Sequence, residues 1–115
     1  MRFKIILALV NDDYQDDVIK AAKDTGATGV TILNARGEGI HKHTSFFGMT
    51  MEAQKDMLLF LVEDFKSDEI MQAIYESGHF KEQGNGIAFC WTVDRAIGLE
   101  SQLPVMEKDT KKNYF

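Results

Sequence analysis

The chain has little cysteine, which can form disulfides, and little proline, which interrupts helices and strands. It has one cysteine, Cys90, and one proline, Pro104, among 115 residues. A single cysteine excludes an internal disulfide and is typical of a reducing compartment, so we expect a cytoplasmic protein. No low-complexity linker is present, and the length suits one core. We expect one domain over residues 1–100 and a polar tail over residues 101–115.

Basic residues and long apolar runs are also scarce. Lys and Arg number 13 against 18 Asp and Glu, which gives a formal net charge of −5. Nucleic-acid binders usually present a basic face, so we expect no nucleic-acid partner. The apolar run over residues 3–10 is too short to cross a bilayer, and acids follow it instead of a cleavage site. We interpret it as a strand and expect no membrane insertion.

What the sequence does contain is an alternation of apolar strands and amphipathic helices. Branched and aromatic apolar residues predict four strands, and apolar residues at helical spacing predict two helices. The predicted strands are residues 3–10, 29–35, 57–62 and 87–93, and the predicted helices are residues 14–25 and 67–77. The order β-α-β-β-α-β is that of the α+β ferredoxin-like fold, with two helices on one face of a four-stranded antiparallel sheet.

Short polar residues and glycines mark the expected ends of the two helices. Asn11, Asp12 and Asp13 offer N-caps to the first helix, and Ser67 offers one to the second. Glycines follow the predicted last turns, Gly26 after the first helix and Gly78 after the second.

The third strand is apolar at every predicted position, and the fourth is nearly so. A strand with one solvated face should alternate between apolar and polar residues. We therefore expect both faces of the sheet to be buried, although the chain offers no further helix to cover the second face. A large bare apolar face invites aggregation, so the simplest cover is another subunit.

Three glycine-containing stretches, taken in order, resemble those of one family. Residues 16–18 (DDV) are followed by residues 26–31 (GATGVT), then by residues 36–39 (RGEG) and residues 84–89 (GNGIAF). Their order and spacing, with the length and the element order, are similar to those of the PII signal-transduction (nitrogen regulatory protein P-II) family. The likeness extends to about Leu99.

The resemblance implies a homotrimer that regulates other proteins and is not an enzyme. Members of the family bind adenine nucleotides in clefts between subunits, sense 2-oxoglutarate and dock a large T-loop onto enzymes or transporters. Glycines in the motifs that line the nucleotide cleft of the family let backbone N–H groups approach phosphate oxygens. By position in the family's motifs, the implied ligand-binding residues are Thr31, Arg36, Gly37, Glu38, Gly39, Gly84, Asn85 and Gly86.

The chain departs from the family at basic positions. Ile87, Gly98 and Glu100 fall where the family carries a lysine and two arginines, which removes much of the charge-assisted binding expected for a triphosphate. The glutamine that the family's loop uses in binding 2-oxoglutarate corresponds to a position near His41 in this chain. The shortened T-loop has no tyrosine. We expect AMP or ADP rather than ATP as the effector, and no redox cofactor.

The segment from Ile40 to Gln54 is the expected docking loop. Aromatic residues and methionine are favoured at interfaces, although the same side chains could fold back onto their own subunit. The candidate docking residues are His41, His43, Phe46, Phe47 and Met49. The expected partner is a membrane transporter or a metabolic enzyme, and the process nitrogen regulation.

Two alternatives remain open. His41 and His43 could make the protein a metal-binding trimer, with His79 as a third ligand, because imidazoles suit zinc or copper. A ligand-free structural docking module is the other. An acylphosphatase would need a basic phosphate loop after the first strand, where residues 11–14 read NDDY. No nucleophile motif supports an enzyme.

Overall fold

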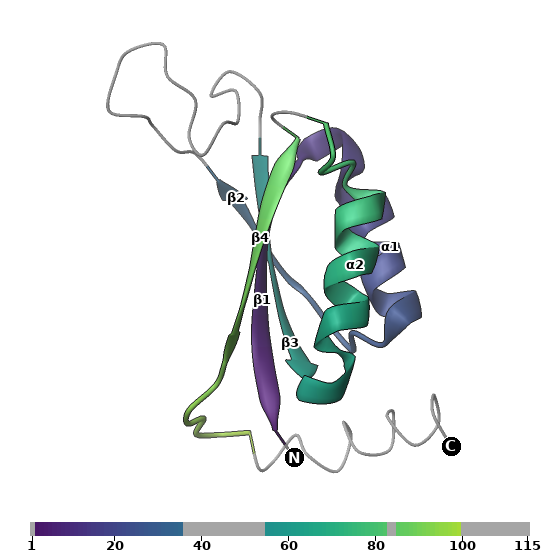
Figure 1. Ribbon diagram of the computed structural model, residues 1–115. Coiled ribbons are helices and arrows are strands. Elements are labelled where there is room, and N and C mark those ends of the chain that lie inside the picture. Colours follow the sequence, from purple (N-terminus) through teal and green to yellow (C-terminus); the bar gives the residue numbers. More distant parts are fainter. Residues whose placement is uncertain (1, 36–54, 83–84, 100–115) are drawn as a thin grey trace.

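The computed structural model describes residues 2–35, 55–82 and 85–99 and has the predicted order of elements (Figure 1). Two short 3-10 turns, η1 and η2, precede the two helices. The elements are β1 (Phe3–Asn11), η1 (Asp12–Tyr14), α1 (Gln15–Thr25), β2 (Thr31–Ala35), β3 (Lys55–Glu63), η2 (Asp64–Lys66), α2 (Ser67–Ser77) and β4 (Gly86–Thr92).

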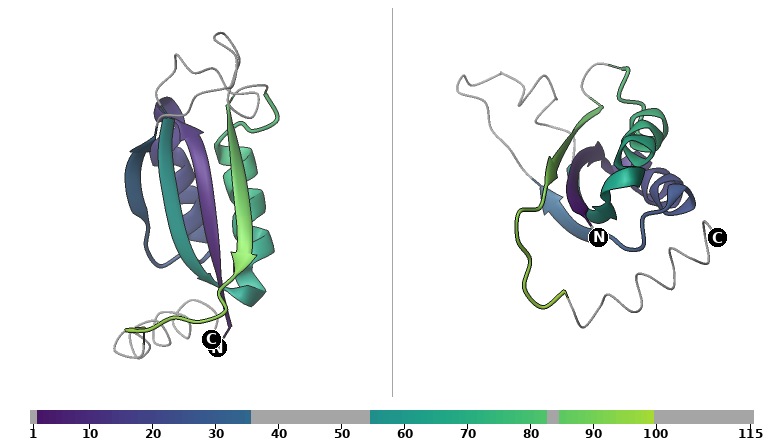
Figure 2. Two further views of the ribbon diagram at one scale, coloured as in Figure 1. Left: turned by 90° about the vertical axis from the view of Figure 1, so that its left-hand side faces the viewer. Right: turned by 60° about the horizontal axis from the view of Figure 1, so that its bottom comes forward.

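The four strands form one sheet in the order β2-β3-β1-β4, and all three neighbouring pairs are antiparallel. Both helices lie on one face of this sheet, and no helix among the described residues lies on the other face (Figures 1 and 2). The predicted ferredoxin-like fold is therefore confirmed. None of the helices in the described part of the chain is long and apolar enough to cross a membrane.

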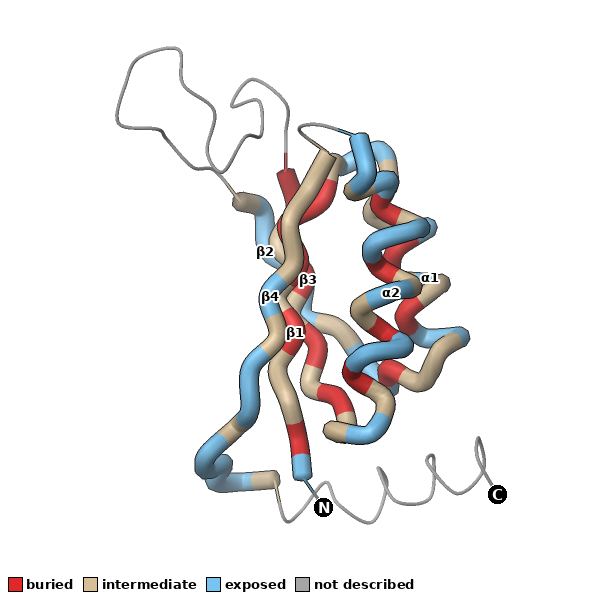
Figure 3. The backbone as a smooth tube through the Cα atoms, viewed as in Figure 1, coloured by how far each residue is buried: buried red, intermediate tan, exposed pale blue. Residues whose placement is uncertain are grey.

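The core lies between the sheet and the two helices, where the buried positions of the central strands face α1 and α2 (Figure 3). Alternate residues of β1 and β3 supply the sheet side of it, which is the period of two that a strand requires. The fully buried core side chains include Ile6, Val10, Leu58, Phe60, Val18, Ile70 and Ile74.

The strands differ from the predicted ranges mainly at their ends. β3 begins at Lys55, two residues before the apolar run, because its pairing with β1 continues to Asn11. β2 begins at Thr31 instead of residue 29, and β4 runs over Gly86–Thr92, one residue earlier than predicted. Backbone pairing across the sheet, which the local composition does not encode, sets these limits.

The predicted N-caps are wrong. Asn11, Asp12 and Asp13 make no side-chain cap to α1 within the described residues; instead η1 leads directly into the helix, and the Gln15 N–H donates to the Asp12 carbonyl. Ser67 is the first residue of α2, and its hydroxyl donates to the Asp64 carbonyl at 2.8 Å. A 3-10 turn before each helix already orders its first turn.

The predicted C-terminal glycines are confirmed, although they act differently. Gly26 has φ of 131°, which suits glycine, and its N–H donates to the carbonyls of Ala22 and Lys23 at 3.1 Å. Gly78 has φ of −86°, and the left-handed residue there is His79 with φ of 56°.

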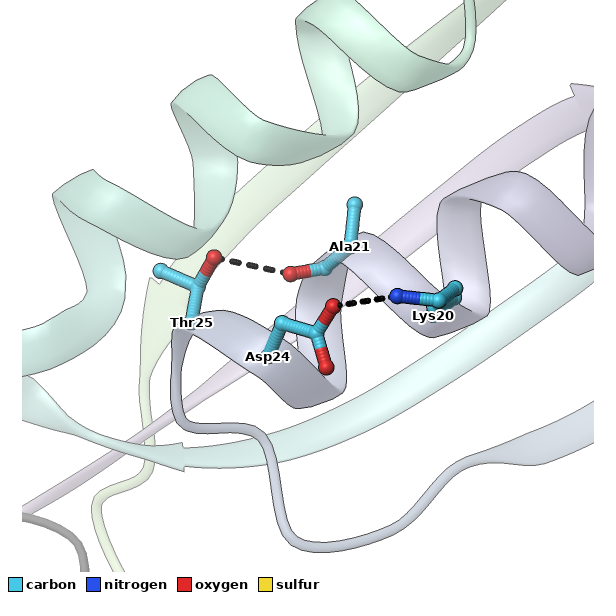
Figure 4. A network of polar contacts seen from close by, with 4 residues as sticks. All are labelled: Lys20, Ala21, Asp24 and Thr25. Carbon is cyan, nitrogen blue, oxygen red and sulfur yellow. Dashed lines mark hydrogen bonds and ion pairs between the residues drawn. The ribbon is translucent and has the colours of Figure 1, made fainter.

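The outer face of α1 is solvated. Lys20 pairs with Asp24 at 2.8 Å, and the Thr25 hydroxyl donates to the Ala21 carbonyl at 2.7 Å (Figure 4). An exposed i,i+4 ion pair adds little to stability.

Candidate functional site

The sheet face on which no described helix lies, called the open face below, is largely apolar across all four strands. The strand register places its side chains in three cross-strand rows. In order from β2 to β4, these rows are Leu33–Met57–Leu9–Ile87, Thr31–Leu59–Leu7–Phe89 and, without β2, Leu61–Ile5–Trp91. Exposure is 53% for Leu33, 39% for Phe89 and 46% for Trp91, so these large apolar side chains meet solvent in the single chain.

The open face ends abruptly in a polar row at the end of β1. Lys55 is paired with Asn11 in the register, and Asn85 follows on the other side of Asn11, next to β4. These three residues are called the polar row. It lies two register positions beyond the row of Met57 and Leu9 and is the next row on this face, so the apolar and polar regions of the face are directly adjacent.

Hydrogen bonds join the polar row into a chain. The Lys55 ammonium donates to Oδ1 of Asn11, and Nδ2 of Asn11 donates to Oδ1 of Asn85 at 2.9 Å. Nδ2 of Asn85 donates in turn to Oε2 of Glu82 and to the His79 carbonyl, both at 3.1 Å. The side-chain amide of Asn85, a predicted ligand-binding residue, is thus committed to contacts within its own chain.

Gly86 is required for a packing reason. A Cβ at this position would lie 2.4 Å from Cε1 of Phe80 and 2.5 Å from the carbonyl oxygen of Leu9. Only glycine fits between the Phe80 ring and β1. The resemblance implied that this glycine lets backbone approach a ligand, and the structure adds a second requirement for it.

Thr31 and Asn85 lie at opposite edges of the sheet. Thr31 begins β2, one edge strand, and Asn85 immediately precedes β4, the other edge strand. Strands are spaced by about 4.8 Å, so two intervening strands separate these residues by roughly 14 Å or more. One chain therefore does not bring Thr31 and Asn85 together.

Most of the other predicted site residues lie outside the described residues. These are Arg36, Gly37, Glu38, Gly39, Gly84, His41, His43, Phe46, Phe47, Met49 and Glu100. Ile87 and Gly98 are two of the positions at which the family carries a basic residue and this chain does not. Ile87 contributes to the open face beside Leu9, and Gly98 is exposed with φ of 85°. The roles given to all of these residues stay predictions.

Two charged residues at the start of β3 were missed as candidates. Lys55 is 8% exposed and Asp56 is 1% exposed. Burial lowers the pKa of the Lys55 ammonium, since the charged form loses solvation. The signal in the sequence is a charged pair directly before the entirely apolar strand predicted over residues 57–62, outside which both residues fall.

Asp56 lies on the helix side of the sheet, opposite Val10 in the register. Burial raises the pKa of its carboxyl, and so do a hydrogen bond and the like charge of Asp12, while Gln15 opposes them by hydrogen bonding. Oδ2 of Asp56 has no hydrogen-bond partner among the residues that the structure describes. The charged form is therefore poorly accommodated.

The described histidine packs on an aromatic ring. His79 lies against Tyr14, with ring centroids 4.4 Å apart and planes inclined by 31°. No group of three or more potential ligands among residues 2–35, 55–82 and 85–99 could hold a metal ion. The predicted His41 and His43 site lies outside these ranges and stays a prediction.

Comparison with known proteins decides the family. The model of the family described as nitrogen regulatory protein P-II matches residues 3–102. The chain belongs to the P-II family. The resemblance drawn from the three glycine-containing stretches is thereby confirmed, and with it the assignment to a family of nitrogen regulatory, signal-transducing proteins.

Several relatives carry the same description. The chain is 32% identical over 103 residues to a nitrogen regulatory protein P-II from Haemophilus influenzae, covering 85% of this chain and 92% of that protein. It is 30% identical, with the same coverage, to the P-II protein of Pasteurella multocida. A solved PII-like signalling protein from Thermus thermophilus aligns with a TM-score of 0.61 and 25% identity, covering 81% of this chain and 88% of that one.

Proposed function

We propose that this P-II family protein is a homotrimeric signalling regulator. It binds an adenine nucleotide, ADP or AMP more tightly than ATP, in the clefts between its subunits. The occupied protein then binds or releases a membrane transporter or a metabolic enzyme in nitrogen regulation. It acts by binding and not by catalysis. The observation that carries the proposal is the placement of Thr31 and Asn85 at opposite edges of one apolar sheet.

The open face supports self-association. Its three apolar rows give the single chain a contiguous patch that soluble monomers rarely expose. Homo-oligomers close by rotational symmetry, and a head-to-tail ring brings one edge of each subunit beside the other edge of the next. A threefold ring would thus place Thr31 of one subunit near residues 84–86 of its neighbour, which completes the ligand site implied by the family resemblance.

The chemistry of the implied cleft favours a small nucleotide. Glycines at residues 37, 39, 84 and 86 provide backbone N–H groups for a phosphate, which is an uncharged means of binding an anion. The chain lacks the usual cations at residues 87, 98 and 100. Since each missing charge-assisted bond costs more as the number of phosphates rises, AMP and ADP lose less affinity than ATP.

The loop from Ile40 to Gln54 is the part of the protein that binds the partner. Phe46, Phe47 and Met49 supply the apolar contacts of a docking surface, flanked by His41 and His43. A nucleotide controls such docking only if it prefers one arrangement of the loop. Affinity for the partner and affinity for the nucleotide are then linked.

Two measurements test the proposal. Light scattering coupled to size exclusion should give the mass of three chains at micromolar concentration, and a single-chain mass would refute the shared site. Calorimetric titrations with ATP, ADP, AMP, 2-oxoglutarate and zinc should give binding heat for AMP or ADP. Heat with zinc alone, abolished by the double substitution His41→Ala and His43→Ala, would favour the metal-binding alternative.

A further inference from the structure

The polar row forms an ordered path between two segments that are far apart in the sequence. It begins at Lys55, where β3 starts, and it ends at Glu82 and His79 in the turn after α2. Asn11, at the end of the central strand β1, is the residue in the middle. We propose that Asn11 is a positioning residue that couples the placement of Lys55 to the conformation of the turn at residues 79–82 and Asn85.

The direction of every hydrogen bond in this path is fixed by its two ends. A lysine ammonium only donates, so Asn11 must turn its oxygen toward Lys55 and its NH₂ toward Asn85. Asn85 must then present its oxygen to Asn11, which leaves its NH₂ for Glu82 and His79. A carboxylate and a carbonyl only accept, so the far end permits the same single arrangement.

Only an asparagine at residue 11 satisfies both neighbours from this backbone position. Oδ1 accepts from Lys55, whose ammonium is largely removed from solvent, and Nδ2 donates to Asn85. An aspartate would keep the acceptor for Lys55 but would place a second oxygen against Oδ1 of Asn85. If Asn85 then rotated its amide, its oxygen would face Glu82 and the His79 carbonyl. Asn11→Asp therefore disconnects the turn while retaining the contact with Lys55.

Backbone hydrogen bonds hold the described part of the turn, including those from the His79 N–H to the Glu76 carbonyl at 3.2 Å and from the Phe80 N–H to the Tyr75 carbonyl at 3.1 Å. The Glu82 N–H donates to the His79 carbonyl at 3.1 Å, and the Asn85 N–H donates to the Glu82 carbonyl at 3.3 Å. His79 has φ of 56°, a conformation that non-glycine residues adopt rarely. The two bonds from Nδ2 of Asn85 add to these backbone bonds, and Asn11 supports them because it engages the oxygen of the same side-chain amide.

The consequence for ligand binding rests on the proposed function, since residues 84–86 are part of its nucleotide site. A nucleotide that fixes the turn would also fix Asn11 and Lys55, and Lys55 is the residue at which the segment from residue 36 to residue 54 enters the sheet. Coupling of this kind is reciprocal. We therefore expect a substitution at Lys55 to alter the turn through Asn11.

Hydrogen exchange on the intact protein without nucleotide tests the coupling. Lys55→Met and Asn11→Asp should each speed exchange of the Glu82 and Asn85 N–H groups by about tenfold, as expected when local opening becomes easier. Gln72→Glu is the matched control, because it also replaces an amide that donates to a carboxylate, Glu76, at 3.0 Å on the exposed face of α2. It should leave the turn unchanged.

Lys55→Met is the decisive variant. If Asn11→Asp speeds exchange at the turn but Lys55→Met leaves it within twofold of the wild type, the bond between Asn11 and Asn85 is merely local and the coupling is refuted. The pKa of Lys55, followed by nitrogen NMR, checks Asn11→Asp independently, since a carboxylate in contact with the ammonium should raise it.

Titration with ADP then separates this inference from the proposed function. If the wild type binds ADP, Asn11→Asp and Lys55→Met should each weaken binding about fivefold or more, while Gln72→Glu should not. Equal ADP affinity in all four proteins would refute a role of the coupling in binding. If the wild type binds neither ADP nor AMP, the proposed function fails, and the hydrogen-exchange result still decides whether the polar row couples Lys55 to the turn.

Discussion

Gly86 and Phe80 are in direct contact: a Cβ at residue 86 would lie 2.4 Å from Cε1 of the Phe80 ring. The contact joins the first residue of β4 to the turn after α2, and the carbonyl oxygen of Leu9 closes the other side at 2.5 Å. The glycine is therefore needed to fold the chain as well as for the ligand-binding role that we propose.

We expect Gly86→Ala to lower the free energy of unfolding by about 1–3 kcal/mol, the usual cost of overpacking. Urea denaturation measures this change. Gly29→Ala is the matched control, because no described atom lies within 4 Å of the Cβ position there. Adding Phe80→Leu should recover part of the loss by removing the ring. An alanine at residue 86 without cost would contradict the packing.

Asp56 should make stability depend on pH. Because burial and Asp12 raise its folded pKa above the unfolded value, ionisation disfavours the fold. Its contribution is fully present below the unfolded pKa and is lost as pH rises through the folded pKa. At pH values above both, the fold is less stable by about 1.4 kcal/mol for every tenfold difference between the two acid dissociation constants.

We therefore expect Asp56→Asn to be more stable than the wild type at neutral pH, with the advantage shrinking toward pH 4. Unfolding free energies of both proteins from pH 4 to pH 8 would show it. Asp12→Asn, which removes the like charge but keeps Asp56, should give a smaller gain of the same sign. A difference between Asp56→Asn and wild type that did not change with pH would contradict this account.

The role of the open face in joining subunits can be tested by a substitution at the centre of this face. Leu7→Lys places a charge between Leu59 and Phe89, and we expect it to convert the proposed trimer into single chains while circular dichroism stays unchanged. Ile97→Lys, at a residue 86% exposed in the single chain, is the control. Light scattering distinguishes the two results. Retention of the trimer in Leu7→Lys would show that another surface joins the subunits.

The Cys90 thiol should react slowly. Burial raises its pKa, as do the charges of Asp68 and Asp64, while Lys4 and Ser67 act against them. Since the thiolate is the reactive form, we expect labelling with a thiol reagent at pH 7 to be at least several-fold slower than for free cysteine. Full speed should return in denaturant. Fast labelling of the folded protein would show an accessible thiolate.

The sequence by itself determined the order of strands and helices and the family. Apolar periods of two and of 3.6 are local properties, and so are the glycine stretches, which is why residues 3–10 and 57–62 predicted strands that the structure contains. The apolar character of β3 on both faces also predicted an open face that needs a cover.

Only the tertiary structure decided which contacts the polar residues at the ends of these elements make. Asn11 was predicted to cap a helix and instead lies between Lys55 and Asn85, residues that are 44 and 74 positions away in the chain. Asp56 falls outside the strand predicted over residues 57–62, yet it belongs to β3 and is buried beside Asp12. The sheet order brings β3 and β4 to either side of β1, and no local pattern specifies which polar side chains then meet. Hydrogen bonds and desolvation act between neighbours in space, so their partners emerge only when the register is set.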